Sequence, residues 1–426
     1  MKIVITNVVA LNAGDSAILH GVVRILREAF GDRARIVVLE RDAAQSAAFY
    51  PTLDFRQAYV STTDSSPGAR LLRRLLGGRR ALNLRRMIAR RSSKRSGFLL
   101  PATARRNRRE MLDADLVVST GGTYLVEHYD FSDKLVQLFL AAGSGRPTVM
   151  FSQSLGPFRL EANIRDVRRL MPGVALLMLR DRKSLEHLRE IGADTRRARV
   201  VADAAFALAD EGRLLDAAAR RTSKTPSVAV SVREWKFPGA ESGEQATLNY
   251  YDSVRAAVTR AVRTHGAKVT FLSTCQGIPR YWTDDSRTAR EIADGLPHDV
   301  RERVSVDTDH HGPDQLIERY ARFDLVIATR MHAAILALSS GTPVLPIAYE
   351  FKTRELFEGM GFGDWVQDIA ELTPAALADL VSRCLAEIPE RRGALIAAVD
   401  EQRRSAREAI ALVRAAAGGG ELPSPA

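Results

Sequence analysis

Two side chains that can carry positive charge, Arg330 and His332, directly follow the apolar run 324–329, and Lys352 follows the next such run. Each run is typical of a buried strand, and the carboxyl ends of parallel strands meet at one edge of a sheet. The helix expected at 332–340 would add the partial positive charge of its N-terminus. The sequence therefore predicts an anion site here. An ordinary ion pair for Arg330 and a capping role for His332 are the structural alternatives.

The elements that would hold these side chains follow one pattern throughout the chain. Short apolar runs alternate with helical patterns, which indicates parallel sheets covered by helices. A polar stretch near 212–226 interrupts the alternation, and the pattern then restarts. We therefore expect an α/β protein with two doubly wound lobes, each binding ligands at the carboxyl ends of its strands. The expected parts are an N-terminal lobe at 1–210, a C-terminal lobe at 226–385, and a terminal helix with a tail at 386–426.

The predicted anion site lies within TRMHAAILALSSGTPVLPIAYEFK at 329–352, and this run resembles the C-terminal signature of the polysaccharide pyruvyl transferase family. The resemblance extends, in order, to NAGDSAIL at 12–19, STGGTYL at 119–125, SQSLGPF at 152–158, LRDRKSLEHLREIG at 179–192, DAAF at 203–206 and SVREW at 231–235. It implies a GT-B-like architecture, with two Rossmann-like lobes facing a cleft. It also implies transfer of a pyruvyl group from phosphoenolpyruvate to a sugar as a ketal. Family members often carry a proline before the final lysine, where this chain has Glu350-Phe351.

The resemblance gives the candidate residues their roles. Phosphoenolpyruvate carries a carboxylate and a phosphate, which require several cations. The donor-binding candidates are Arg330, Arg233, Arg180 and Lys352. His332 is the candidate general acid that protonates the methylene carbon, and Asp15 could accept a proton from the acceptor hydroxyl. Surface ion pairs remain the alternative for Arg233 and Arg180, and a first-turn helix carboxylate is the alternative for Asp15.

The acceptor candidates lie after two strands of the first lobe. Gly14 would permit a tight turn, and Gly121 and Gly122 would let a ligand approach the backbone. The full set is Asn12, Gly14, Gly121, Gly122, Tyr124, Glu127 and His128. A purely structural turn is an equal alternative for the residues from Gly121 onward.

Several other site types are not supported. Cys275 and Cys384 lie far apart in no paired motif, which favours a reducing compartment over a disulfide framework. In the loop 307–312, Asp309, His310 and His311 are metal-ligand types, but we expect them to face solvent. No complete dinucleotide or phosphate-loop motif occurs. We therefore expect no metal and no cofactor, with phosphoenolpyruvate as co-substrate.

One segment accounts for the net charge of +11. Residues 69–109 contain fifteen Lys or Arg and no Asp or Glu, so the rest of the chain carries a net charge of −4. Its interleaved apolar residues suit amphipathic helices on an anionic membrane surface, and an exposed charged face is the plainer interpretation. With Phe98 as its single aromatic residue, it offers no platform for nucleic acid. We expect a cytoplasmic enzyme that acts on a glycan or lipid-linked saccharide. Peripheral attachment at the inner face of the cell membrane is the alternative location.

Two other functions remain open from the sequence. A GT-B glycosyltransferase with a nucleotide-sugar donor would have the same fold, because a fold does not determine the donor. A non-catalytic protein that binds a membrane or nucleic acid through 69–109 is the second alternative.

Overall fold

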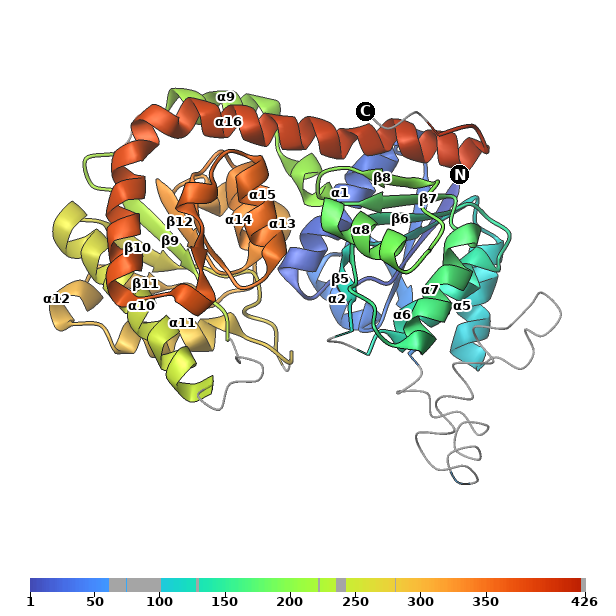
Figure 1. The fold of residues 1–426 in the computed structure, drawn as a ribbon, viewed down its shortest axis with the longest axis horizontal. Helices are drawn as coiled ribbons and strands as arrows, with labels where there is room; N and C mark the ends of the chain where they lie inside the picture. Colours follow the sequence, from blue (N-terminus) through green and yellow to red (C-terminus); the bar gives the residue numbers. More distant parts are fainter. Residues whose placement is uncertain are drawn as a thin grey trace. The chain divides into compact units, whose positions relative to one another are not determined.

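The computed structural model describes residues 1–60, 74, 101–127, 130–220, 223–234, 243–279 and 281–422. These residues form two compact units (Figure 1). The first unit contains Met1–Ala10, Ile18–Ala204 and Ser405–Ala426, and the second contains Leu11–Ala17 and Ala205–Arg404. Most of the predicted basic segment 69–109, namely 69–73 and 75–100, lies outside the described residues, as does His128.

The first unit is built on a parallel sheet. Its described strands run in the order β3-β2-β1-β4-β6-β7-β8, and β5 pairs with β6. The strands are β1 (Lys2–Thr6), β2 (Arg35–Glu40), β3 (Asp54–Gln57), β4 (Leu116–Ser119), β5 (Gly122–Leu125), β6 (Thr148–Leu155), β7 (Leu176–Leu179) and β8 (Ala198–Val200). The order reverses between β1 and β4, which marks the switch point where doubly wound sheets bind ligands.

Helices cover this sheet because each one buries an apolar stripe against it. They are α1 (Ala13–Phe30), α2 (Ala43–Phe49), α5 (Ala102–Leu112), α6 (Ser132–Ala142), α7 (Glu161–Leu170) and α8 (Arg182–Glu190), with short 3-10 turns η2 (Met171–Gly173) and η3 (Ala204–Leu208). In α1, Ile18, Val22 and Ile25 are buried, as the sequence pattern predicts.

The second unit repeats the design with a second parallel sheet. The order of its described strands is β11-β10-β9-β12-β13-β14, so its switch point lies between β9 and β12. The strands are β9 (Ser227–Ser231), β10 (Lys268–Phe271), β11 (Val304–Val306), β12 (Leu325–Ala328), β13 (Val344–Ala348) and β14 (Gln367–Asp368). The expected fold class, two doubly wound parallel α/β units, is confirmed.

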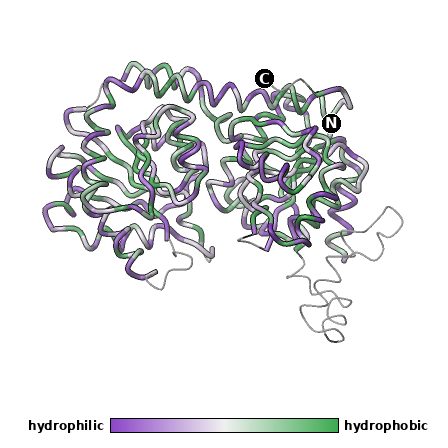
Figure 2. The backbone as a smooth tube through the Cα atoms, in the orientation of Figure 1, coloured by the Kyte–Doolittle hydropathy of each residue, from purple (hydrophilic) through white to green (hydrophobic). Residues whose placement is uncertain are grey.

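Helices also cover the sheet of the second unit, and α14 (Met331–Ser339) matches the helix expected at 332–340 to within one residue at each end. They are α9 (Glu211–Ala219), α10 (Gly243–His265), α11 (Asp285–Asp294), α12 (His298–Arg301), α13 (Pro313–Tyr320), α14 (Met331–Ser339) and α15 (Phe351–Gly359), with η4 (Gly363–Trp365) and η5 (Ile369–Glu371). The tube in Figure 2 is mostly hydrophobic along the strands of both sheets. Such runs are typical of parallel strands that are buried on both faces.

The chain ends in the long helix α16 (Pro374–Gly418), red in Figure 1. Its residues up to Arg404 belong to the second unit and those from Ser405 to the first. The expected boundary at 385/386 therefore falls inside a continuous helix. Among the described residues, no helix is long and apolar enough to cross a membrane.

Candidate functional site

The predicted anion site centres on Arg330, which caps α14 directly after β12. Its Nε and Nη2 donate to the two carboxylate oxygens of Asp285 at 2.5 and 2.7 Å. The Asp285 side chain is fully buried, and that of Arg330 is 11% exposed. Burial raises the pKa of Asp285, and the facing guanidinium of Arg330 opposes this effect. The pair holds the guanidinium in a fixed orientation, and neither bond uses Nη1.

Arg233 follows β9, the neighbour of β12 across the switch point. Its guanidinium carbon lies 4.4 Å from the ring centroid of Tyr349, which follows β13. This distance is that of a cation–π contact. Burial raises the pKa of Tyr349, with Arg233 opposing, so the ring stays neutral near pH 7. Beneath them, the Tyr250 hydroxyl hydrogen-bonds Thr329 Oγ1 at 2.8 Å and accepts from the Arg233 backbone N–H at 3.4 Å.

Lys352 lies in the first turn of α15, directly after β13 and at the expected sheet edge. Its side chain is 10% exposed and forms an ion pair with Glu350, the residue that caps α15. The resemblance leads one to expect a proline before this lysine, where this chain has Glu350 and Phe351. The carboxylate therefore offsets part of the positive charge that Lys352 brings to the site.

His332 contacts a segment from the start of the chain. A Cβ on Gly14 would lie 3.0 Å from both Cβ and Nδ1 of His332 and 3.2 Å from Asn12 Oδ1. The absence of a side chain at Gly14 thus lets the first turn of α1 reach the imidazole. Contacts this short are uncommon for a Cβ atom. A larger residue at position 14 would therefore displace the imidazole by a few tenths of an ångström.

The same segment is anchored on the loop after β10. The Ala13 N–H donates to Thr274 O at 3.2 Å, and the Cys275 thiol donates to Asn12 Oδ1 at 3.1 Å. Burial raises the pKa of Cys275 to about 12, so the thiol remains protonated. Leu11–Ala17 consequently belongs to the second unit, although the sequence suggests the first lobe for Asn12, Gly14 and Asp15.

Asn12 and Asp15 also serve the helix that follows them. The Asn12 carbonyl accepts from the Ser16 N–H at 2.7 Å, and its side-chain oxygen accepts from the Gly14 N–H at 3.0 Å. Asp15 lies in the first turn of α1, where a carboxylate stabilises the free N–H groups. Both residues thus stabilise the start of α1 in the unit that holds His332.

Arg180 belongs to the first unit, whereas Arg330 and Arg233 belong to the second. It forms an ion pair with Asp203 at 2.6 Å, and the two side chains are 2% and 3% exposed. It also donates to the hydroxyls of Ser154 and Thr123, both at 2.7 Å. The guanidinium is therefore a buried connection between β6, β7 and the segment before η3.

Close packing within the protein accounts for Gly121. A Cβ at this position would lie 2.5 Å from the Ser152 carbonyl oxygen, so the approach that Gly121 permits is that of β6. Gly122 has a φ of 147°, a backbone conformation that residues with a side chain rarely adopt. The structure thus agrees with the structural alternative for Gly121.

Tyr124 and Glu127 are engaged within the first unit. The Tyr124 hydroxyl contacts Ser119 Oγ at 3.0 Å and Gln153 Nε2 at 3.1 Å. Glu127 accepts from Asn163 and from the N–H groups of Arg159 and Leu160, each at 2.9 Å. Although burial opposes it, these bonds lower the pKa of Glu127. Glu127 thereby holds the residues that lead into α7.

The expectation for the loop 307–312 is partly wrong. Asp309 is exposed, but His311 is buried, and its Nε2 lies 2.9 Å from a carboxylate oxygen of Asp307. Arg319 also donates to Asp307, at 2.8 Å. This pairing gives the buried imidazole a carboxylate partner four residues earlier in the same loop. Within the described ranges, no group of three metal-ligand side chains occurs.

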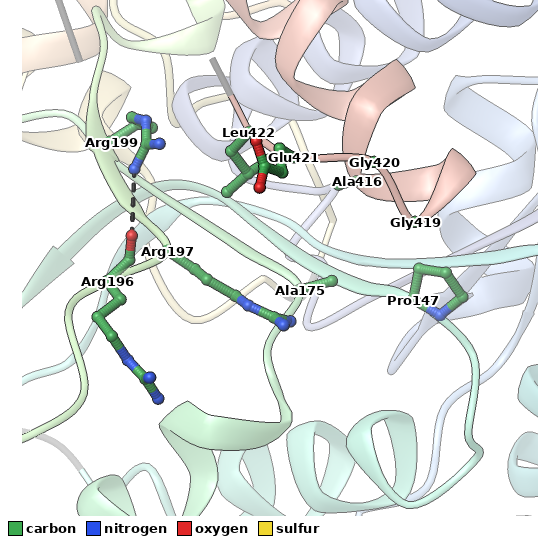
Figure 3. A pocket seen from close by; sticks show the side chains of 10 residues that line it. All are labelled: Pro147, Ala175, Arg196, Arg197, Arg199, Ala416, Gly419, Gly420, Glu421 and Leu422. Carbon is green, nitrogen blue, oxygen red and sulfur yellow. Dashed lines mark hydrogen bonds between the residues drawn. The ribbon is translucent and has the colours of Figure 1, made fainter. Parts of the chain in front are cut away.

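A cavity of about 620 Å³ lies at the opposite edge of the first sheet, where Pro147, Ala175 and Arg197 precede β6, β7 and β8. Figure 3 shows the Arg197 side chain reaching beneath Leu422 and Glu421 near the end of the chain. None of the predicted site residues lines this cavity.

Sequence reasoning missed three residues that the geometry brings to attention. Asp285 fixes Arg330, Tyr349 supports Arg233, and Glu40 ends β2 as a buried carboxylate, 3% exposed. Glu40 and Tyr349 each follow an apolar run, so their position at a strand end was a usable signal. Asp285 has no such signal, because its partner lies 45 residues away.

Comparison with solved structures supports the architecture. The chain is similar to Anabaena HepE in complex with UDP-glucose (TM-score 0.55, 15% identity, 96% of this chain and 95% of that one). It is also similar to a glycosyltransferase from Rickettsia africae (TM-score 0.58, 9% identity, 99% of each chain). A third is the UDP-GlcNAc 2-epimerase of Neisseria meningitidis (TM-score 0.52, 9% identity, 96% and 98%). The fold is thus that of GT-B glycosyltransferases and epimerases, which confirms the expected class.

Comparison of sequences is more specific. The amylovoran biosynthesis protein AmsJ of Erwinia amylovora is 26% identical over 407 residues, which cover 92% of this chain and 94% of that protein. Residues 12–350 match the family described as polysaccharide pyruvyl transferase, and this range includes Asn12, Arg233, Arg330 and His332. The chain belongs to the polysaccharide pyruvyl transferase family.

Proposed function

We propose that this enzyme moves the pyruvyl group of phosphoenolpyruvate onto a sugar of a polysaccharide, glycolipid or lipid-linked saccharide. The product is a pyruvate ketal, and phosphate is released. The observation that carries the proposal is the Arg330–Asp285 pair at the switch point, with Arg233 held on Tyr349 beside it. The planar guanidinium of Arg233 suits binding of a carboxylate or phosphate, and Arg330, oriented by Asp285, adds a donor at Nη1.

The donor would be held mainly by the second unit. Arg330 offers Nη1, Arg233 offers a half-buried guanidinium, and Lys352 adds an ammonium partly balanced by Glu350. These charges would compensate the phosphate as it leaves, so that fixed cations supply the electrostatic stabilisation. We include no metal and no cofactor in this proposal. Arg180 takes no direct part in it, because its guanidinium is used by Asp203, Ser154 and Thr123.

The reaction would begin at the methylene carbon of the donor. His332 gives a proton to this carbon while one sugar hydroxyl attacks C2, and Asp15 accepts the hydroxyl proton. The C2–O bond to phosphate then breaks, and the second hydroxyl attacks C2 to close the ketal. Of the two hydroxyl protons, one replaces the proton that His332 gave and the other leaves with phosphate. The contact of Gly14 with His332 supports this role for the loop 12–15.

A nucleotide-sugar donor is the second candidate function. It is favoured by the similar fold of HepE, which was crystallised with UDP-glucose. The family match over residues 12–350 favours the pyruvyl donor instead. The two candidates differ in the ligand that stabilises the protein.

The test is the melting temperature with each donor. A ligand at 100 times its dissociation constant stabilises a protein by about 2.7 kcal/mol. We expect phosphoenolpyruvate to raise the melting temperature of the wild type and not that of Arg233→Ala. Loss of Arg330 alone would leave Asp285 buried and unpaired, which destabilises by roughly 3–5 kcal/mol. The second variant is therefore the double substitution Arg330→Met with Asp285→Asn.

The matched control is Arg263→Ala, an exposed arginine of the same unit that pairs with Asp299. It should keep the full shift. No shift with phosphoenolpyruvate, together with a shift from UDP-glucose, would replace the pyruvyl proposal with the glycosyltransferase one.

A further inference from the structure

The loop between β10 and α11, which leads to Asp285 of the anion site, exposes an indole ring. Trp282 is 76% exposed, the highest value of any large apolar side chain among the described residues. Tryptophan usually buries most of its surface, so an exposed ring on a loop indicates an interaction. The mechanism proposed above does not use Trp282.

Both ends of this loop contact the candidate site. The Asp285 N–H donates to Cys275 O at 2.7 Å, so the loop closes on itself. At one end Cys275 donates to Asn12, and at the other Asp285 binds Arg330. The loop is therefore held at one end by Asn12, from the segment that contacts His332, and at the other end by Arg330.

The short chain distance keeps Trp282 near this site. Asp285 lies three positions after Trp282 in the chain, and a fully extended chain spans at most about 3.6 Å per residue. The two Cα atoms are therefore no more than about 11 Å apart, which is roughly two sugar rings. A saccharide with a hydroxyl at the reacting carbon could reach the indole with its next ring.

The ring is also supported from one side. Tyr281, half-buried, lies beside it with ring centroids 5.8 Å apart. On the other side of the loop, Asp284 caps α11 by accepting from the Ser286 N–H at 3.0 Å and the Ser286 hydroxyl at 2.7 Å. These contacts position the loop end before any ligand binds, which lowers the ordering cost of binding.

We propose that Trp282 is the stacking platform for a sugar ring of the acceptor saccharide. A pyranose presents a face of C–H groups that packs on an aromatic face. Asp284 and Asp285 follow Trp282 closely in the chain, and their negative charges disfavour an anionic membrane as the partner, because like charges repel. The inference rests on the proposed function in one respect, namely that the saccharide is the acceptor.

The experiment measures saccharide binding separately from donor binding. The probes are immobilised oligosaccharides ending in glucose, galactose, mannose or N-acetylglucosamine, tested with the wild type, Trp282→Ala and Trp282→Phe. We expect Trp282→Ala to weaken binding by about tenfold, the value of one good aromatic contact, and Trp282→Phe to recover part of it. The matched control is Leu215→Ala in α9 of the same unit, where the side chain is 66% exposed.

A spectroscopic measurement tests the same contact directly. In a Trp235→Phe background, Trp282 is the exposed indole and Trp365 the buried one, at 1% exposure. The best saccharide from the array should shift the emission to shorter wavelength and protect it from acrylamide quenching.

The outcomes separate this inference from the proposed function. Saccharide binding that needs Trp282, without a phosphoenolpyruvate shift, would support the platform and reject the donor. Equal binding by the wild type and Trp282→Ala, or a wild type that binds none of the saccharides, would overturn the platform. Binding to phosphatidylserine vesicles that depends on Trp282 would overturn it in favour of a membrane contact.

Discussion

At the scale of single residues, the contact between Gly14 and His332 suggests how proton transfer is organised. The imidazole follows a strand end of the second unit, and the loop that meets it comes from the start of the chain. His332, the candidate general acid, and Asp15, the candidate acceptor of the hydroxyl proton, therefore belong to the same unit. The geometry is consistent with acid–base work on both substrates, where groups must lie within hydrogen-bond reach.

The proposed role of His332 as general acid predicts how its substitution changes the reaction rate. His332→Asn removes the acid while keeping a polar side chain of similar reach, so phosphate release in the presence of an acceptor should slow by about 10²–10⁴-fold. Donor binding should persist, with an unchanged melting-temperature shift from phosphoenolpyruvate. The matched control is His298→Asn, because this imidazole is 92% exposed in α12 of the same unit. A rate and pH profile unchanged by His332→Asn would remove His332 from the mechanism.

At the scale of the elements, the carboxyl edge of the first sheet contains a buried acid at the end of β2. Glu40 is 3% exposed and accepts from the Asp42 N–H at 2.7 Å. Burial raises its pKa to about 7, an effect that the backbone hydrogen bond from Asp42 opposes. The folded state thus holds this proton more tightly than the unfolded state does.

The sign of the pH effect follows from that difference. Below the unfolded pKa of about 4.5, Glu40 is protonated in both states and lowers the free energy of unfolding no more than a neutral residue would. As the pH rises from there to about 7, the unfolded state ionises first, so the free energy of unfolding falls. Between pH 5 and pH 8 the wild type should lose on the order of 2–3 kcal/mol relative to Glu40→Gln. Urea unfolding of both proteins at the two pH values measures this. The control is Glu186→Gln, an exposed glutamate of the same unit, and equal pH dependence in wild type and Glu40→Gln would contradict the prediction.

The elements also show what the sequence could and could not predict. Strand ends and helix starts are local, so Arg330 after β12 and Lys352 after β13 could be located from the apolar runs, and the family resemblance added Arg233 after β9. Their partners depend on how distant segments meet. Tyr349 lies 116 residues from Arg233, and Asn12 lies 263 residues from Cys275. Pattern and turn residues carry no information on these pairs. His311 is a different case, because its partner Asp307 lies only four residues away, and residue type in a loop did not indicate that this imidazole is buried.

At the scale of the whole molecule, the chain passes between its two units more than once. The segment Leu11–Ala17 belongs to the second unit, while α1 continues in the first, and α16 changes unit after Arg404. A single boundary near 210, read from one polar stretch, could not represent these crossings. Composition reports where the chain is polar, whereas membership in a unit depends on contacts.

The basic segment supplies the last prediction at this scale. We propose that residues 69–109 attach the enzyme peripherally to an anionic membrane, where each Lys or Arg near the surface contributes about 1 kcal/mol. Residues 69–100 hold eleven of the fifteen positive charges and no acidic residue, so their removal changes the net charge from +11 to 0.

The structure determines where this deletion must end. Asn107 of α5, 2% exposed, accepts from the Tyr59 N–H at 2.6 Å and donates to Gln57 O at 2.9 Å. Removal of 101–109 would therefore damage the first unit, whereas replacement of 69–100 by a Gly/Ser linker retains α5.

The variant should lose binding to phosphatidylserine vesicles and keep the phosphoenolpyruvate shift, because Arg330, Arg233 and His332 belong to the second unit. Cosedimentation with phosphatidylserine vesicles measures the first effect, with phosphatidylcholine vesicles and a linker of equal length that retains the eleven charges as controls. Undiminished binding to anionic vesicles would reject the membrane role, and loss of the donor shift would mean that the donor site depends on residues 69–100.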